Sequence, residues 1–328
     1  MASKVPQVTP STPVPHTSNK NKSSSSYPTS PSLTSNLDAS PLKSALFPGC
    51  CASILIWRCP ACFAGTSFGK PLSDGGDIHV AMDGNFHHHH RRSAGANPPF
   101  YDPTYFLSKH QVDATGTHIE KQQKTPPKAR KGPVPDEAID SCESSYEAAD
   151  GKKQKTSMDN FDDTDLMALI CRHDILLFFA NINSPGEPVA LLVHLFELLP
   201  LQATVVGLYD MGCVLDRSIS LVSVLEILWP ISDDWYLEYN ILLEQVAAWL
   251  QFATTAMHAY GHEWACQLVY NPRLVPSLGL SDGEGTERLW SRLVKLIGIE
   301  RSSSVRFILF LADNWPAHFR GSDNTVFG

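Results

Sequence analysis

The chain has 328 residues, of which 43% are hydrophobic, and a formal net charge of -8. This length fits two average domains or one large domain with insertions, and the apolar content supports a buried core. The negative charge excludes a strongly basic coat for nonspecific nucleic-acid binding, but it is compatible with a basic channel. Because the eight cysteines are spread along the chain, we expect reduced thiols rather than the dense disulfide framework of a small secreted domain. We expect neither a secretory signal nor a membrane span, since the apolar runs fall far short of about 20 residues.

In residues 1–43 about half of the side chains are Ser, Thr or Pro. Such a composition cannot bury enough apolar surface to offset chain entropy, so this segment is predicted to be a disordered tail. Strands are then predicted at 77–82 and 203–209, and helices at 189–199, 242–268 and 285–297. Because strands and helices alternate, the pattern indicates an α/β core with a helical insertion.

Acidic residues stand at three element boundaries. Asp83 and Asp210 each follow an apolar strand, and Glu284 and Glu287 lie three residues apart where a helix begins. Taken singly, each acid has an ordinary reading as a turn residue or a helix cap. Together they can converge on divalent metal, and two metals roughly 3.5–4 Å apart support in-line displacement at phosphorus.

Cysteine and histidine residues form a second pattern. His258, His262 and Cys266 recur every four residues, so a helix over 242–268 would place them on one side, and Cys171 and His173 form a short pair. Four of these five side chains can make a zinc site, and the alternative is that they are ordinary buried side chains.

A Cys-x-x-Cys pair, Cys59 and Cys62, is half of a zinc knuckle or a redox motif and needs a partner from elsewhere in the chain. The basic segments 121–131 and 152–155, and His87–His90 with Arg91 and Arg92, are suited to phosphate contacts or are simply solvated loops.

Several long phrases resemble the Kyakuja–Dileera–Zisupton (KDZ) transposases, a eukaryotic group best known from fungal genomes. They stand in the family's order and the resemblance spans about residues 59–304: VAMDGNF at 80–86, LMALICRHD at 166–174, LYDMGC at 208–213, HAYGHEWACQ at 258–267 and SDGEGTER at 281–288.

The resemblance implies a transposable-element protein with a ribonuclease-H-like core that cuts and joins DNA in the nucleus, using Mg²⁺ or Mn²⁺. Asp83 and Asp210 match the two catalytic aspartates, and Glu284 matches the third acid, with Glu287 as the alternative; all four are candidate catalytic residues. The resemblance further implies that the family's Cys/His positions bind zinc or brace the insertion; they are matched by Cys171, His173, His258, His262 and Cys266. The expected partner is DNA and no membrane; the oligomeric state is left open.

The expected organisation is a tail at 1–43, a KDZ-like domain at 44–304 and an atypical end at 305–328. The segment 232–250 also departs from the family pattern. These departures keep a second reading open, in which the chain is a truncated or degenerate, catalytically inactive transposon relic that at most binds zinc or DNA.

Overall fold

The structure is a computed structural model that describes residues 49–87, 91, 93, 103–123, 132–151, 165–182, 186–221 and 249–300. All of these residues belong to one unit, which spans 42–328. The expected tail at 1–43, the atypical end at 305–328, most of the segment 232–250 and most of the basic segments lie outside the described residues.

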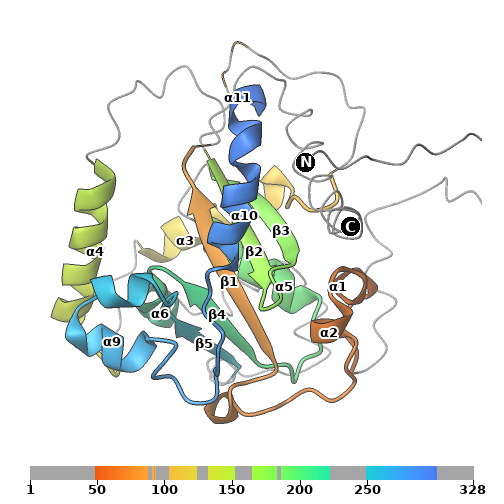
Figure 1. Cartoon of the computed structure of the whole chain (residues 1–328), viewed down its shortest axis with the longest axis horizontal. Helices are drawn as coiled ribbons and strands as arrows, with labels where there is room; N and C mark the ends of the chain where they lie inside the picture. The colour runs from red at the N-terminus through yellow and green to blue at the C-terminus, as the bar shows by residue number, and fades with distance from the viewer. Residues whose placement is uncertain are drawn as a thin grey trace, which may run out of the picture. The chain divides into compact units, whose positions relative to one another are not determined.

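A five-stranded mixed sheet forms the centre of this unit, in the order β3-β2-β1-β4-β5 (Figure 1). β1 pairs antiparallel with β2, which pairs antiparallel with β3, whereas β1–β4 and β4–β5 are parallel pairs. The strands are β1 (Ile78–Asn85), β2 (Asp165–Cys171), β3 (Leu176–Ile182), β4 (Val205–Tyr209) and β5 (Leu250–Ala253). The α/β class is therefore confirmed, and β1 and β4 are the two strands predicted from the sequence.

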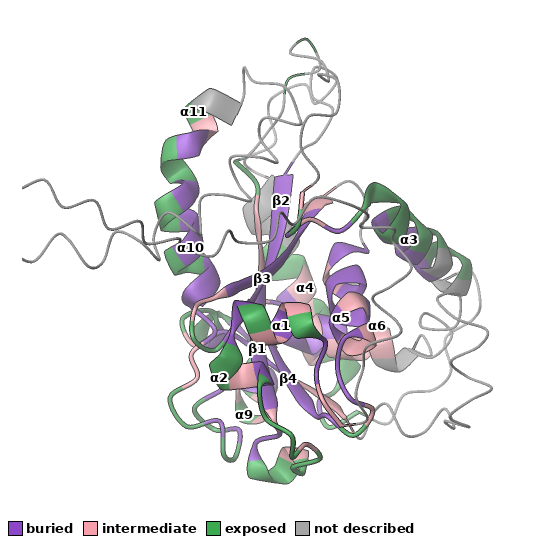
Figure 2. Cartoon of the chain, turned by 90° about the vertical axis from the view of Figure 1, so that its right-hand side faces the viewer, coloured by how far each residue is buried: buried purple, intermediate pink, exposed green. Residues whose placement is uncertain are grey.

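Helices cover both faces of the sheet because successive residues of a strand point to opposite faces. Val80 and Met82 of β1 face a core shared with α1, α3 and α5, whereas Ala81 faces a second core shared with α10. In Figure 2 the strands are buried between these helices, and α10 is buried along one side only. The helices of the first face are α1 (Ser53–Arg58), α3 (Lys109–Gln123) and α5 (Glu187–Glu197).

The predicted helix at 285–297 is present as α10 (Gly285–Leu293), which continues through η8 (Val294–Leu296) and α11 (Ile297–Glu300). Its buried side carries Trp290 and Leu293, which pack on the sheet, while Glu287 and Arg288 are exposed. The remaining described helices are α2 (Pro60–Phe63), η2 (Leu72–Asp74), α4 (Asp136–Gly151), α6 (Gly212–Leu221), η7 (His258–Gly261) and α9 (Trp264–Tyr270).

The prediction of one continuous helix over 242–268 is wrong for the part that the structure describes. That part contains β5, the short helix η7 and the start of α9. The strand forms because Phe252 and Ala253 become buried when β5 pairs with β4, which outweighs the local helical pattern. As a consequence, the Cys/His side chains of this region do not lie on one helix face.

Candidate functional site

Asp83 lies in β1, two residues before the strand ends, and Asp210 directly follows β4, so the two aspartates are at neighbouring positions on adjacent strands. The parallel register pairs Met82 with Tyr209, so the residue that follows each of them is an aspartate. Burial first, and then the neighbouring charge of Asp210, raise the pKa of Asp83 from 3.8 to about 7. Two carboxyls thus share a partly buried position in which their charges repel each other.

Helix α10 brings a third set of groups to this position. The indole N–H of Trp290 donates to Asp83 Oδ2 at 2.8 Å. Glu287 lies one helical turn before Trp290, hence on the same side of α10, and its charge also raises the pKa of Asp83. The Asp83-facing side of α10 therefore carries both a hydrogen-bond donor and an exposed carboxylate.

Glu284 precedes α10 and is only 8% exposed. Its Oε1 accepts a hydrogen bond from the backbone N–H of Met257 at 2.7 Å. Its Oε2 is buried with no hydrogen-bond partner. A buried carboxylate oxygen without a donor is unfavourable and marks a position that a cation or a donor would satisfy.

His258 belongs to the acids rather than to the cysteines. Its Nδ1 lies 3.1 Å from Asp210 Oδ1, which also accepts a hydrogen bond from Thr255 Oγ1 at 2.6 Å. The hydrogen bond to Asp210 raises the pKa of His258 to about 9, and the charge of Glu284 adds to the effect. At neutral pH His258 is therefore a cation beside the carboxylates.

The five Cys/His residues singled out in the sequence are divided among three places. Within the described part of the chain, ligand atoms of three or more Cys, His, Asp or Glu side chains lie within 4.8 Å of one another in two groups, both of the type Cys₃His. Cys171 and His173 are in the first group, and His262 and Cys266 are in the second. The acids form no such group, so their oxygens would have to move closer together to share one ion.

The first cluster consists of Cys59, Cys62, Cys171 and His173. The Cys-x-x-Cys pair at the start of α2 thus meets the end of β2 and the turn that follows it. His173 Nδ1 lies 3.1 Å from Cys62 Sγ and 3.6 Å from Cys59 Sγ. A hydrogen bond from Cys62 lowers the pKa of Cys171 below its usual value, although burial acts in the opposite direction.

The second cluster consists of Cys142, Cys213, His262 and Cys266. These residues come from α4, the start of α6, the loop after η7, and α9. Sequence reasoning missed Cys142 and Cys213 as ligands. Cys213 could have been found, because it ends the sequence phrase that carries Asp210. Cys142 could not, because it has no Cys or His near it in the sequence. All eight cysteines are free, and both clusters can hold a metal ion such as zinc.

A family model described as Kyakuja-Dileera-Zisupton transposase matches residues 77–315, which is most of the chain. The chain belongs to the KDZ transposase family. The match contains all four candidate acids and the whole second cluster, whereas Cys59 and Cys62 of the first cluster lie before it. No curated protein and no solved structure matches this KDZ chain. In the described part of the KDZ chain, no helix is both long and apolar enough to cross a membrane.

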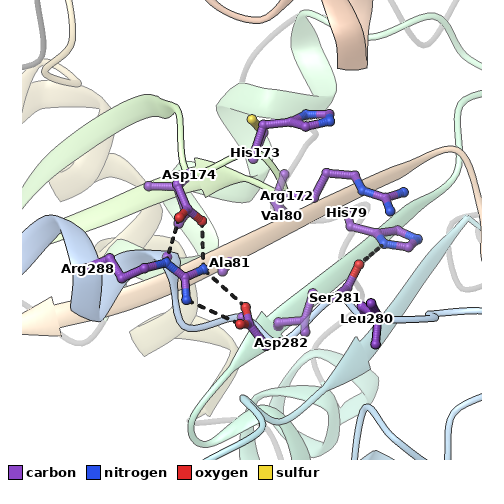
Figure 3. Close-up of a pocket in the computed structure, with 15 residues that line it drawn as sticks. His79, Val80, Ala81, Arg172, His173, Asp174, Leu280, Ser281, Asp282 and Arg288 are labelled. Atoms are coloured by element: carbon purple, nitrogen blue, oxygen red, sulfur yellow. Dashed lines mark hydrogen bonds and ion pairs between the residues drawn. The ribbon is translucent and has the colours of Figure 1, made fainter. Parts of the chain in front are cut away.

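A cleft of about 410 Å³ lies beside the loop before α10 in this KDZ family member (Figure 3), and none of the four candidate acids lines it. Ala81 and Leu208 line it, and they stand two residues before Asp83 and Asp210, on the same face of the sheet. Arg172 and His173 also line the cleft. The cleft therefore carries cationic and histidine side chains beside the carboxylates of Asp174 and Asp282.

Arg288 closes one side of the cleft by joining two acids. Its guanidinium contacts Asp174 at 2.6 Å and Asp282 at 3.2 Å. Figure 3 shows Arg288 between these two carboxylates, which come from the β2–β3 turn and from the loop before α10. These ion pairs fix the first turn of α10, which carries Glu287, to the turn that carries His173.

Proposed function

We propose that the protein is a DNA transposase that cuts phosphodiester bonds and joins strands at a metal site made by Asp83, Asp210 and a glutamate of the α10 segment. The observation that carries the proposal is the pairing of Met82 with Tyr209, because it sets the two aspartates next to each other at one end of the sheet. Membership of the KDZ family supports the same reaction class.

The sheet also supports a ribonuclease-H-like core. Three antiparallel strands are followed by two parallel ones, and the aspartates stand on the adjacent strands β1 and β4. A helix that crosses the same face, α10, then supplies the third acid. This combination is what we expect of such a core.

The donor set fits a hard divalent cation. Carboxylate oxygens are the ligands that Mg²⁺ and Mn²⁺ prefer. The repulsion between Asp83 and Asp210 and the unpartnered Oε2 of Glu284 are both features that a bound cation would relieve. When bound, the metal would activate the attacking water or 3′-hydroxyl and stabilise charge on the phosphate. The chain's own part is to orient Asp83 through Trp290 and to place the His258 cation beside Asp210.

Glu287 is the better candidate for the third acid by geometry. It is exposed and shares the side of α10 that holds Asp83. Glu284 has one oxygen committed to the backbone of Met257, although its other oxygen is unpartnered. Both glutamates therefore enter the test.

The test is cleavage of duplex DNA by the full chain with Mg²⁺ or Mn²⁺. Asp83→Asn and Asp210→Asn should each lower the rate by at least roughly 100-fold. Glu287→Gln should do the same if it is the third acid, and Glu284→Gln if that residue is. Asp140→Asn, which changes an acid on α4 that is 65% exposed, serves as the control and should cleave like the parent. Cleavage that survives both aspartate substitutions would refute the assignment.

A second function is favoured by the spacing of the acids. Because their oxygens do not meet at metal-holding distance in the described structure, an inactive relic that binds DNA without cutting it is the competing proposal. Filter binding separates the two: a parent chain that retains DNA but leaves it uncut with either metal would establish the relic.

We further propose that zinc is the ion of both Cys/His clusters, because three thiolates and one imidazole are a common tetrahedral zinc set. Metal analysis of the purified chain should find two zinc ions, and Cys59→Ser with Cys62→Ser should leave one. DNA as the partner and the nucleus as the place of action follow from the proposed reaction.

A further inference from the structure

His262 connects the second Cys/His cluster to a catalytic candidate. Its Nδ1 faces the cluster, 3.4 Å from Cys213 Sγ, and its Nε2 lies 2.8 Å from the backbone oxygen of Asp210. His262 is only 9% exposed, so water has little access to it. One imidazole therefore touches both the cluster and the residue at the end of β4.

A metal ion at the cluster would set the direction of this hydrogen bond. An imidazole that binds metal through Nδ1 is neutral and keeps its proton on Nε2. The Asp210 carbonyl can only accept, so the Nε2–H must be the donor. A histidine that binds a metal through one ring nitrogen commonly donates a hydrogen bond from the other nitrogen, and the acceptor fixes the orientation of the ring.

The chain around Asp210 is held by the same cluster from the other side. Cys213, three residues after Asp210, is a ligand in the first turn of α6. Between them stands Gly212, where a Cβ would lie 2.6 Å from the backbone oxygen of Ala253 on β5. The turn from β4 into α6 is therefore tightly packed, and it carries two links to the cluster.

Backbone contacts hold the other ligands in place. The N–H of Glu263 donates to Cys142 Sγ at 3.3 Å. The side chain of Gln267 donates to the backbone oxygen of His262 at 2.7 Å. The cluster is thus organised before any ion binds.

We propose that an ion bound by Cys142, Cys213, His262 and Cys266 fixes Asp210 in its position through the imidazole of His262, which makes His262 a positioning residue of the acid site. This inference rests on the proposed zinc occupancy and on the proposed role of Asp210. The ion would then be a structural requirement for the acid site, although it lies outside it.

The test uses His262→Cys in the full chain, which keeps four ligands for zinc but removes the donor to Asp210. Zinc content should stay at two ions per chain. Hydrogen exchange of the backbone amides in residues 205–213 should become roughly tenfold faster, the effect of losing about one buried hydrogen bond. His173→Cys makes the same chemical change in the first cluster and should leave exchange of this segment unchanged.

The opposite result is equally clear. If His262→Cys keeps its zinc and the segment exchanges as in the parent, the positioning role is refuted. In case His262→Cys does not fold, the chain carrying Cys59→Ser and Cys62→Ser offers a second measurement, because its one remaining ion can be removed by chelation and dialysis. Removal should accelerate exchange of 205–213, and unchanged exchange would overturn the inference. Neither readout depends on DNA cleavage, so a chain that fails to cut DNA still tests it.

Discussion

Replacing Asp83 by Asn should stabilise the metal-free protein at alkaline pH. The folded pKa of Asp83 is raised from 3.8 to about 7, first by burial and then by the charge of Asp210. A carboxyl with a raised folded pKa contributes stability that is complete below the unfolded pKa and is lost as the pH rises through the folded pKa. The parent chain should therefore lose stability through this group between about pH 4 and pH 7, and Asp83→Asn should not.

The magnitude follows from the width of that interval. Each pKa unit corresponds to about 1.4 kcal/mol. Between pH 5 and pH 7 the unfolded carboxyl is ionised and the folded one is not, so the free energy of unfolding of Asp83→Asn should gain about 3 kcal/mol relative to the parent. Asparagine has one acceptor oxygen for the two donors to Asp83, the Trp290 indole N–H and the Gly84 N–H. The loss of one of these hydrogen bonds lowers the stability of Asp83→Asn by an amount that does not vary with pH, so the test is the pH dependence of the difference.

Urea unfolding of both chains at pH 5, 6, 7 and 8, without added Mg²⁺ or Mn²⁺, measures this difference. Asp282→Asn is the control. Although partial burial raises the pKa of Asp282, hydrogen bonds from Arg288 hold it below its usual value. Asp282 is therefore ionised in both the folded and the unfolded state from pH 5 to pH 8. The difference in free energy of unfolding between Asp282→Asn and the parent should not vary with pH. A constant difference between Asp83→Asn and the parent at all four pH values would refute the reasoning.

Adding metal should offset most of this difference in stability between the parent and Asp83→Asn. Mn²⁺ at about 100 times its dissociation constant should stabilise the parent by about 2.7 kcal/mol and Asp83→Asn by much less. Equal stabilisation of the two chains would place the Mn²⁺ away from Asp83.

Three further outcomes are expected. Trp290→Phe removes a donor from Asp83, so the pKa of Asp83 should rise further and the pH midpoint of Mn²⁺ binding should move upward; an unmoved midpoint would show that the indole N–H does not act on Asp83. Gly283→Ala should cost about 1–3 kcal/mol in urea unfolding, because φ is +78° and the added Cβ would lie 2.9 Å from the nearest side chain; a loss near zero would contradict this backbone geometry. The imidazole of His258 should titrate by NMR near pH 9, and in Asp210→Asn its pKa should fall toward 6.5. The same pKa in both chains would contradict the ion pair between His258 and Asp210.

The acid-bearing elements could be predicted because each has a strong local pattern. An apolar run that ends at Asp83, another that ends at Asp210, and an amphipathic segment after Glu284 identify β1, β4 and α10 without tertiary information. What the local pattern could not give is the register that pairs Met82 with Tyr209, since it depends on which strands become neighbours. For the same reason the local pattern does not choose between Glu284 and Glu287, which stand on either side of the start of α10.

The Cys/His clusters show the opposite case. Their ligands come from segments far apart in the chain, so spacing along the sequence carries little information about them. His258 shares a sequence phrase with His262 and Cys266, but η7 and the loop after it separate them, and His258 joins Asp210 instead. Cys142 sits in α4 with no nearby ligand in the sequence, and only packing brings it to Cys266, with the two sulfurs 3.7 Å apart.

The sequence by itself determined the family and the α/β class, because these depend on the order of residues and on short-range periodicity. The tertiary structure decided which side chains meet: two aspartates on parallel strands, a histidine beside them, and two separate Cys₃His clusters in place of one. These contacts form between residues as far apart as Asp83 and Trp290. Pairing of strands and packing of helices across the sheet create such contacts, and no local pattern encodes them.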